Sequence, residues 1–337
     1  MPPSRTRGAA ALPITYKRLD PAPVTATLTD RPPPRRDTNL RQVRPRYGEL
    51  VIRGLLFLAA LVSVLTTIGI VFSLVPPTIS FFSESEVTAR EFFTGTDWAP
   101  LFANAKFGVL PLVTGTLMVT GIAILVAIPL GLGAAVYLSE YARPRARKIL
   151  KPILEVLAGI PTVVLGFFAL EFLTGVILGP LFGIRGFNAL SAGIVMGIMI
   201  IPTIASLSED AMSAVPRSLR EGAYALGSTK RQVASLVVFP AALSGIVAAI
   251  VLGISRAIGE TMIVAIAAGQ TPNLSFNPTE GMQTMTSFIA SAGIGDVPVG
   301  SIGYETIFAV GSLLFVITLA MNAVSIRLVR KYREVYE

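Results

Sequence analysis

Six long apolar runs constrain the fold of this chain more than any other feature of its sequence. They cover residues 50–75, 111–139, 149–178, 187–207, 237–268 and 304–326. Each is near or above the ~20 residues that an α-helix needs to cross a bilayer. Only 14% of the 337 residues are charged, whereas soluble proteins carry roughly 25%. We therefore predict an all-α membrane protein with six transmembrane helices, in which residues 50–337 form the transmembrane domain.

Prolines and glycines inside the runs predict irregular helices. Pro129, Pro161 and Pro202 should kink the helices that contain them, because proline removes a backbone donor. The small-residue pair Gly131 and Gly133 should allow a close contact between two helices.

The distribution of positive charge predicts the orientation. Most of the 28 Lys and Arg residues lie before the first run, or shortly after the second, fourth and sixth runs. By the positive-inside rule, both termini then lie in the cytoplasm. The basic residues are spread over the inner membrane surface, which argues against a patch for nucleic acid. Residues 1–49, rich in Pro and basic residues, predict a disordered cytoplasmic tail, with attraction to anionic lipid as the alternative.

Two longer segments are expected on the outer side, at residues 76–110 and 269–303. The first contains four acidic residues and the aromatic residues Phe92, Phe93 and Trp98. Both segments are interpreted either as solvated linkers or as docking surfaces for an external partner.

A charged, amphipathic stretch interrupts the apolar runs at residues 208–236, and we expect it to form a cytoplasmic elbow of two helices. Ser218 and Glu221 have the spacing of a capping box, which predicts the start of the first helix. Gly227 should end that helix in a left-handed conformation. Thr229 and Gln232 repeat the capping-box spacing and predict a second helix, which enters the membrane after Pro240. Four basic residues should be exposed on the elbow: Arg217, Arg220, Lys230 and Arg231.

Two charged residues lie deep in the fifth run, at Arg256 and Glu260. A charge near the middle of a membrane helix costs roughly 2.5–3.5 kcal/mol, so both side chains should face the protein interior. Their spacing of four residues would allow them to pair with each other. The pair is interpreted either as a salt bridge that locks the bundle or as a site on a transport path, where Arg256 attracts an oxyanion. Glu171, deep in the third run, is a further candidate and could pair with Arg256 across helices.

Several kinds of chemistry are excluded by composition. The chain has no Cys and no His, so disulfides, thiolate chemistry and the commonest metal ligands are absent. The dipeptide Gly-Lys does not occur, so there is no Walker A phosphate loop. We predict that the chain is not an enzyme and holds no cofactor or metal; any ATP and Mg²⁺ would be bound by a partner ATPase.

The elbow resembles the EAA loop of ABC importer permeases, whose pattern is E-A-A-x3-G-x9-I-x-L-P. The match consists of Glu221, Gly222, Ala223, Gly227 and Pro240, and it departs from the pattern at Gly222 and at Val237 and Phe239. The resemblance implies that these five residues belong to a coupling helix that sits in a groove of an ATPase subunit.

Other segments resemble the PstC-type permease subunits of phosphate importers, which have the type I ABC importer permease fold. They are the runs FFTGTDWAPLFANAKFGVLPLVTGTL, PLGLGAAVYLSEYA, GIPTVVLGFFAL and SRAIGETM. The resemblance implies a PstA-type partner subunit, two copies of a cytoplasmic ATPase, and an extracytoplasmic phosphate-binding protein. It also implies that Arg256 and Glu260 act in the passage of inorganic phosphate across a prokaryotic plasma membrane.

Three alternatives remain open at this point. The first is a permease for another oxyanion, such as sulfate or molybdate. The second is an ion-coupled carrier or channel that needs no ATPase, which leaves the elbow without a role. The third is a membrane-embedded sensor or scaffold that uses the elbow only for docking.

Overall fold

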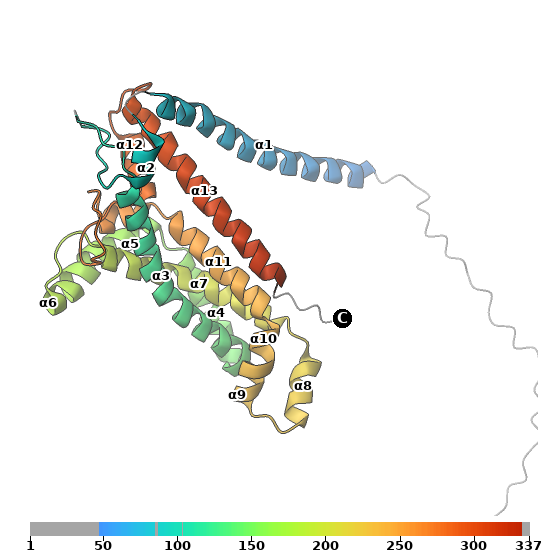
Figure 1. Ribbon diagram of the computed structural model, residues 1–337. Coiled ribbons are helices and arrows are strands. Elements are labelled where there is room, and N and C mark those ends of the chain that lie inside the picture. The colour runs from blue at the N-terminus through green and yellow to red at the C-terminus, as the bar shows by residue number, and fades with distance from the viewer. Residues whose placement is uncertain (1–46, 85–86, 103, 332–337) are drawn as a thin grey trace, which may run out of the picture. The chain divides into compact units, whose positions relative to one another are not determined.

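The computed structural model describes residues 47–84, 87–102 and 104–331, and that part of the chain is almost wholly helical (Figure 1). Residues 1–46 of the predicted tail therefore lie outside the described residues. The chain divides into two compact units, residues 1–60 and 61–337, and the packing below is that of the second. In chain order the elements are α1 (Tyr47–Ser83), α2 (Ala89–Thr94), α3 (Leu110–Val136), η1 (Tyr137–Tyr141), α4 (Pro144–Ala158), α5 (Thr162–Phe167), η2 (Phe168–Leu178), α6 (Gly179–Phe182), α7 (Ala189–Ser213), α8 (Arg217–Ala225), α9 (Lys230–Gln232), η3 (Val233–Val238), α10 (Phe239–Ala241), α11 (Leu243–Ile258), η4 (Val264–Ala268), α12 (Met285–Ile294) and α13 (Ile302–Lys331), where η denotes a π-helix.

The predicted all-α membrane fold is confirmed. Among the described residues, five helices are long and apolar enough to cross a membrane: Gly48–Ser83, Leu110–Tyr141, Thr162–Phe182, Ala189–Ser213 and Ile302–Arg327. A sixth is obtained if Lys230–Ala241 and Leu243–Ile258, which meet at 71°, are counted as one span.

The third apolar run differs from the prediction because it forms two helices. The first, α4, ends at Ala158, and α5 begins only at Thr162. Pro161 cannot donate to the helical hydrogen-bond ladder and disfavours helical geometry in the residue before it. The expected kink at Pro161 is therefore a complete break, and α4 is a separate helix with no fully buried residue.

The loops expected between the spans are partly helical. The first helix, α1, continues through Pro76 and Pro77 to Ser83, and α12 lies within the expected outer loop 269–303. After the fourth apolar run, α7 continues to Ser213, which shortens the expected coupling loop.

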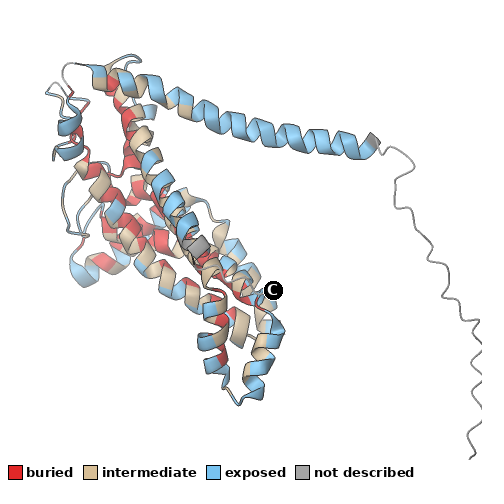
Figure 2. Ribbon diagram, turned by 45° about the vertical axis from the view of Figure 1, so that its right-hand side comes forward, coloured by how far each residue is buried: buried red, intermediate tan, exposed pale blue. Residues whose placement is uncertain are grey.

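The close contact predicted from small residues forms between α3 and α7. A methyl group built on Gly193 of α7 would lie 2.6 Å from Cβ of Ile122, and one on Gly197 would lie 2.8 Å from Cβ of Val126. Gly131 also lies in close contact, because a methyl group there would lie 3.0 Å from Cβ of Ile204. Gly133, in contrast, faces open space. Figure 2 shows the buried residues gathered where the helices face one another, with the tip of the elbow exposed.

Two of the three aromatic residues predicted in the first outer segment belong to the core. Phe92 and Trp98 are buried, and their rings make edge-to-face contacts with Phe81 and Phe288, at centroid distances of 5.7 and 5.0 Å respectively. Phe93 is the exposed one of the three predicted aromatic residues.

Candidate functional site

The elbow predicted from the sequence is present, and Gly227 forms its turn. Gly227 has φ of +81°, the left-handed conformation expected of it. The second capping box is also present: the Thr229 side chain accepts from the Gln232 amide, and the Gln232 side chain accepts from the Thr229 amide. The first is wrong, because α8 begins at Arg217 after Pro216 and Ser218 lies inside the helix without capping it.

The surface of the elbow exposes most of the residues predicted for coupling. Glu221, Gly222 and Gly227 are exposed, whereas Ala223 is partly buried. Between them Leu226 projects, with 89% of its surface exposed.

Pro240 lies in α10, at the far end of the elbow. The chain bends by 71° between residues 230–241 and residues 243–258. The second elbow helix therefore does not run straight into the membrane, as the sequence pattern predicted. It ends at the bend, and α11 begins at Leu243 in a new direction.

Arg220 is the exception among the basic residues of the elbow, because it points inward. Only 17% of its side chain is exposed. Its guanidinium donates to Glu140 Oε1 from Nη2 at 3.1 Å, and to the carbonyl oxygens of Met212 and Val215 at 2.7 and 2.6 Å. The prediction that Arg220 is exposed is therefore wrong. The Arg220 side chain instead ties α8 to η1 and to the end of α7.

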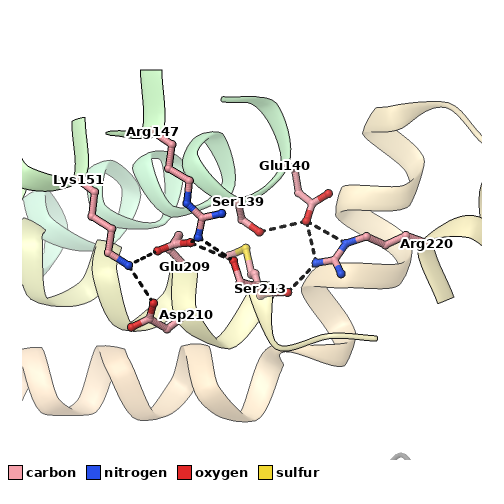
Figure 3. A network of polar contacts seen from close by, with 9 residues as sticks. Ser139, Glu140, Arg147, Lys151, Glu209, Asp210, Ser213 and Arg220 are labelled. Atoms are coloured by element: carbon pink, nitrogen blue, oxygen red, sulfur yellow. Dashed lines mark hydrogen bonds and ion pairs between the residues drawn. The ribbon is translucent and has the colours of Figure 1, made fainter. Parts of the chain in front are cut away.

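A second polar network, missed from the sequence, surrounds Glu209 near the end of α7 (Figure 3). The Glu209 side chain is only 1% exposed. It forms ion pairs with Arg147 and Lys151 of α4, the second at 2.9 Å, and it accepts from the Ser213 hydroxyl at 2.9 Å. Two cations and a hydroxyl compensate the cost of burying this carboxylate, and they hold α4 against α7.

Arg256 and Glu260 lie next to a break in the membrane span. The last turn of α11 contains Arg256, α11 ends at Ile258, and η4 begins at Val264. The Arg256 side chain is exposed and donates from Nη1 to the Thr203 hydroxyl of α7 at 3.2 Å.

The hydrogen bonds of the Glu260 carboxylate are with residues that follow the break. One of its carboxylate oxygens, Oε1, accepts from the backbone amides of Met262 and Ile263 at 3.1 and 3.4 Å. Its backbone oxygen accepts from the Thr286 hydroxyl of α12 at 2.7 Å. The structure shows no ion pair between Glu260 and Arg256, so the pairing inferred from their spacing is wrong. The reason is that the helix does not continue from one residue to the other.

Glu171, the third predicted path residue, is exposed on η2. It lines an open hollow of about 610 Å³ together with Thr174 and Arg185. Within the described part of the chain Glu171 forms no ion pair with Arg256, so the predicted contact across helices is not formed. Within the part of the chain that the structure describes, no ion pair joins the three candidate path residues, and the Arg256 guanidinium donates to a neutral hydroxyl.

Comparison with protein families gives a match to a family described as "Binding-protein-dependent transport system inner membrane component", over residues 127–334. A probable ABC transporter permease protein, YqgH of Bacillus subtilis (strain 168), is 35% identical over 278 residues, which is 82% of this chain and 88% of that protein. The phosphate transport system permease protein PstC of Mesorhizobium japonicum is 33% identical, covering 69% of this chain and 76% of that protein. PstC of Xylella fastidiosa (strain 9a5c) is 34% identical, covering 71% and 80%.

Solved structures share the fold at lower sequence identity. The inward facing MetNI methionine ABC transporter aligns with a TM-score of 0.53 and 21% identity, covering 67% of this chain and 96% of that chain. A bacterial ABC transporter involved in the import of alginate aligns with a TM-score of 0.56 and 15% identity, covering 86% of this chain and 100% of that chain. These similarities support the helical arrangement and say nothing about the substrate of this chain.

Proposed function

Because the chain belongs to the family of binding-protein-dependent transport system inner membrane components, we propose that it is the PstC-type permease subunit of an ATP-driven phosphate importer. Members of this family are membrane subunits of transporters and not enzymes, and the chain is accordingly a multi-pass protein of the inner membrane. The observation that carries the substrate assignment is its similarity to relatives named as phosphate transport system permeases.

Arg256 is the residue that would attract phosphate. Its guanidinium is exposed at the end of α11 and donates to a neutral hydroxyl. A charge with no ion pair can attract an anion, and a site with one arginine releases the anion more easily than a cluster would. Broken helices of this kind surround substrate sites in many transporters.

Glu260 would act by holding the break in place. Its carboxylate receives the first amides of the segment that follows the break, much as an N-cap residue does. In that role Glu260 fixes the position of the Arg256 end of α11 without neutralising the arginine. Glu171 and Arg185 would line an outer approach to the path.

The elbow would dock on a cytoplasmic ATPase. Exposed Glu221 and Leu226 lie on or directly after α8, and this surface resembles the EAA loop. The full transporter would then contain this chain, a PstA-type subunit, two copies of the ATPase with its ATP and Mg²⁺, and an extracytoplasmic phosphate-binding protein. Both termini of the chain would lie in the cytoplasm.

Uptake of radiolabelled phosphate tests this function directly. The chain is co-expressed with its partner subunits in cells that lack their own high-affinity phosphate importer, and uptake of phosphate is compared with that of sulfate and molybdate. We expect ATP-dependent uptake of phosphate alone. Uptake of sulfate or molybdate instead would refute the substrate assignment, and transport by the purified chain alone in liposomes would refute the dependence on an ATPase.

A further inference from the structure

The short π-helix η1, at the end of α3, contacts both arms of the elbow. From α8, Arg220 reaches Glu140 with two guanidinium nitrogens, at 3.1 and 3.3 Å. From α9, the Lys230 ammonium lies 5.1 Å from the centroid of the Tyr141 ring, within the range of a cation–π interaction. Two neighbouring residues of one element thus bind the two helices on either side of the Gly227 turn.

The Arg220–Glu140 contact is shielded from water. Only 6% of the Glu140 side chain and 17% of the Arg220 side chain are exposed. Surface ion pairs contribute little to stability, but a shielded pair in which the arginine also donates to backbone carbonyls is much more specific in its geometry. The Ser139 hydroxyl donates to the same Glu140 oxygen at 3.1 Å and fixes the carboxylate further.

Arg220 connects three elements at once, as Figure 3 shows. Besides Glu140 of η1, it holds the carbonyl oxygens of Met212 and Val215 at the end of α7. The Met212 oxygen belongs to the last helical turn of α7, where partial negative charge favours a cation, and Val215 lies two residues beyond the end of that helix. One planar guanidinium thus links α8 to both η1 and the end of α7.

Apolar packing holds the elbow in the fold independently of this ion pair. A buried cluster joins the ends of α3 and α7 to the elbow and to α11, through Ala135, Met212, Val215, Val233, Val238, Ala242 and Ile246. The bonds of Arg220 to the Val215 and Met212 carbonyl oxygens do not involve the Glu140 carboxylate. Loss of the carboxylate should therefore loosen the connection between α8 and η1 without unfolding the chain.

We propose that Arg220 and Glu140 are positioning residues that transmit the displacement of the coupling helix α8 into η1 and the adjoining ends of α3 and α7. This inference rests on the proposed function, since it assumes that an ATPase moves α8.

Two measurements test the proposal on Glu140→Ala, Glu140→Gln and Arg220→Lys, with Lys148→Ala as control. Lys148 is an exposed residue of α4 that lies outside these contacts. The first measurement is hydrogen exchange of α8 amides in the chain held in lipid nanodiscs. The second is phosphate transported per ATP hydrolysed by the reconstituted complex, with assembly checked by co-purification.

We expect Glu140→Ala to speed exchange in α8 about tenfold, which is the effect of losing roughly one hydrogen bond to a charged group. The transport ratio should fall about tenfold while the complex stays assembled. Glu140→Gln keeps an acceptor and should restore part of both the exchange rate and the transport ratio. Arg220→Lys should behave like Glu140→Ala, because lysine lacks the planar, forked donors of a guanidinium. Lys148→Ala should match wild type.

A transport ratio that stays at the wild-type value in Glu140→Ala would overturn the proposal, even if α8 exchange increases, because the pair would then be only structural. Loss of assembly in both Glu140 variants would overturn it as well. If the wild-type complex moves no phosphate, the proposed substrate is refuted, while α8 exchange and the rate of ATP hydrolysis still report on the pair.

Discussion

Arg256 donates to the Thr203 hydroxyl of α7 at 3.2 Å and not to Glu260, four residues further along the chain. The carboxylate of Glu260 accepts from the amides of Met262 and Ile263 instead. The break after Ile258 thus separates two residues that a continuous helix would have brought together. The guanidinium of Arg256 and the carboxylate of Glu260 therefore have different partners.

The different bonds of Arg256 and Glu260 predict different effects of substitution. We expect Arg256→Gln to reduce phosphate uptake at least tenfold with the complex assembled, because the positive charge of the path is lost. Glu260→Gln should retain much of the uptake, since an amide oxygen still accepts from the Met262 and Ile263 amides, whereas Glu260→Ala should lose it. Uptake at matched expression checks this, and equal losses in the two glutamine variants would contradict it.

Gly227 and Gly222 offer a matched pair on the elbow. Neither has an atom within 4 Å of an added methyl group, but only Gly227 has a positive φ. Gly227→Ala should destabilise the turn by about 1–2 kcal/mol, the cost of a left-handed conformation, and weaken co-purification of the ATPase. Gly222→Ala lies inside α8 and should stabilise that helix by up to about 1 kcal/mol. Equal retention of the ATPase by both variants would show that the turn conformation is unimportant for docking.

The elbow could be predicted because its signals are local. Gly227 and the Thr229–Gln232 capping box act within a few residues, and the structure contains both. The two breaks, at Pro161 and after Ile258, were missed because both apolar runs are long enough to be read as continuous helices. Gly259 followed by the charged Glu260 was the available signal for the second break.

The Glu209 network could not be predicted for a different reason. Its partners Arg147 and Lys151 lie 62 and 58 residues earlier in the chain. The positive-inside rule counts such cations but does not pair them with acidic residues on other helices. Glu209 follows the fourth apolar run directly, so the sequence does not distinguish it from a solvated flanking residue.

Replacing the carboxylate of Glu209 or of the adjacent Asp210 by an amide should have different effects on stability. The Glu209 side chain is 1% exposed and Asp210 is 60% exposed, although both bind Lys151. Glu209→Gln leaves Arg147 and Lys151 without their buried counter-charge. These cations can reach water, so we expect a loss of about 1–3 kcal/mol, at or below the 3–5 kcal/mol measured for fully buried pairs. Asp210→Asn should change stability by less than about 0.5 kcal/mol.

Thermal unfolding in detergent, followed by fluorescence of Trp98, measures this difference. The midpoint of Glu209→Gln should lie several degrees below that of wild type. The midpoint of Asp210→Asn should equal that of wild type. The Glu209 network would be shown to contribute nothing to stability if both variants had the wild-type midpoint.

Glu280 predicts a pH-dependent change in the segment between η4 and α12. Hydrogen bonds from Ser275, Asn273 and Asn277 lower the pKa of this carboxyl below its ordinary value of 4.5. A carboxyl with a lowered pKa stabilises the folded segment at pH values above 4.5, and this contribution is lost as the pH falls through the lower pKa. The segment should therefore be fully ordered at pH 7 and loosen only in the acid range below 4.5.

Hydrogen exchange of residues 273–281, corrected for the intrinsic effect of pH on amide exchange, checks this prediction. Wild type should lose protection below pH 4.5, because a protonated Glu280 accepts less strongly from Asn273 and Asn277. Glu280→Gln is the matched control, since it carries a neutral side chain at every pH. It should show weaker protection at pH 7 and no transition in the acid range. A wild-type segment that exchanges at the same corrected rate from pH 7 to pH 3 would contradict the role of the Glu280 carboxylate.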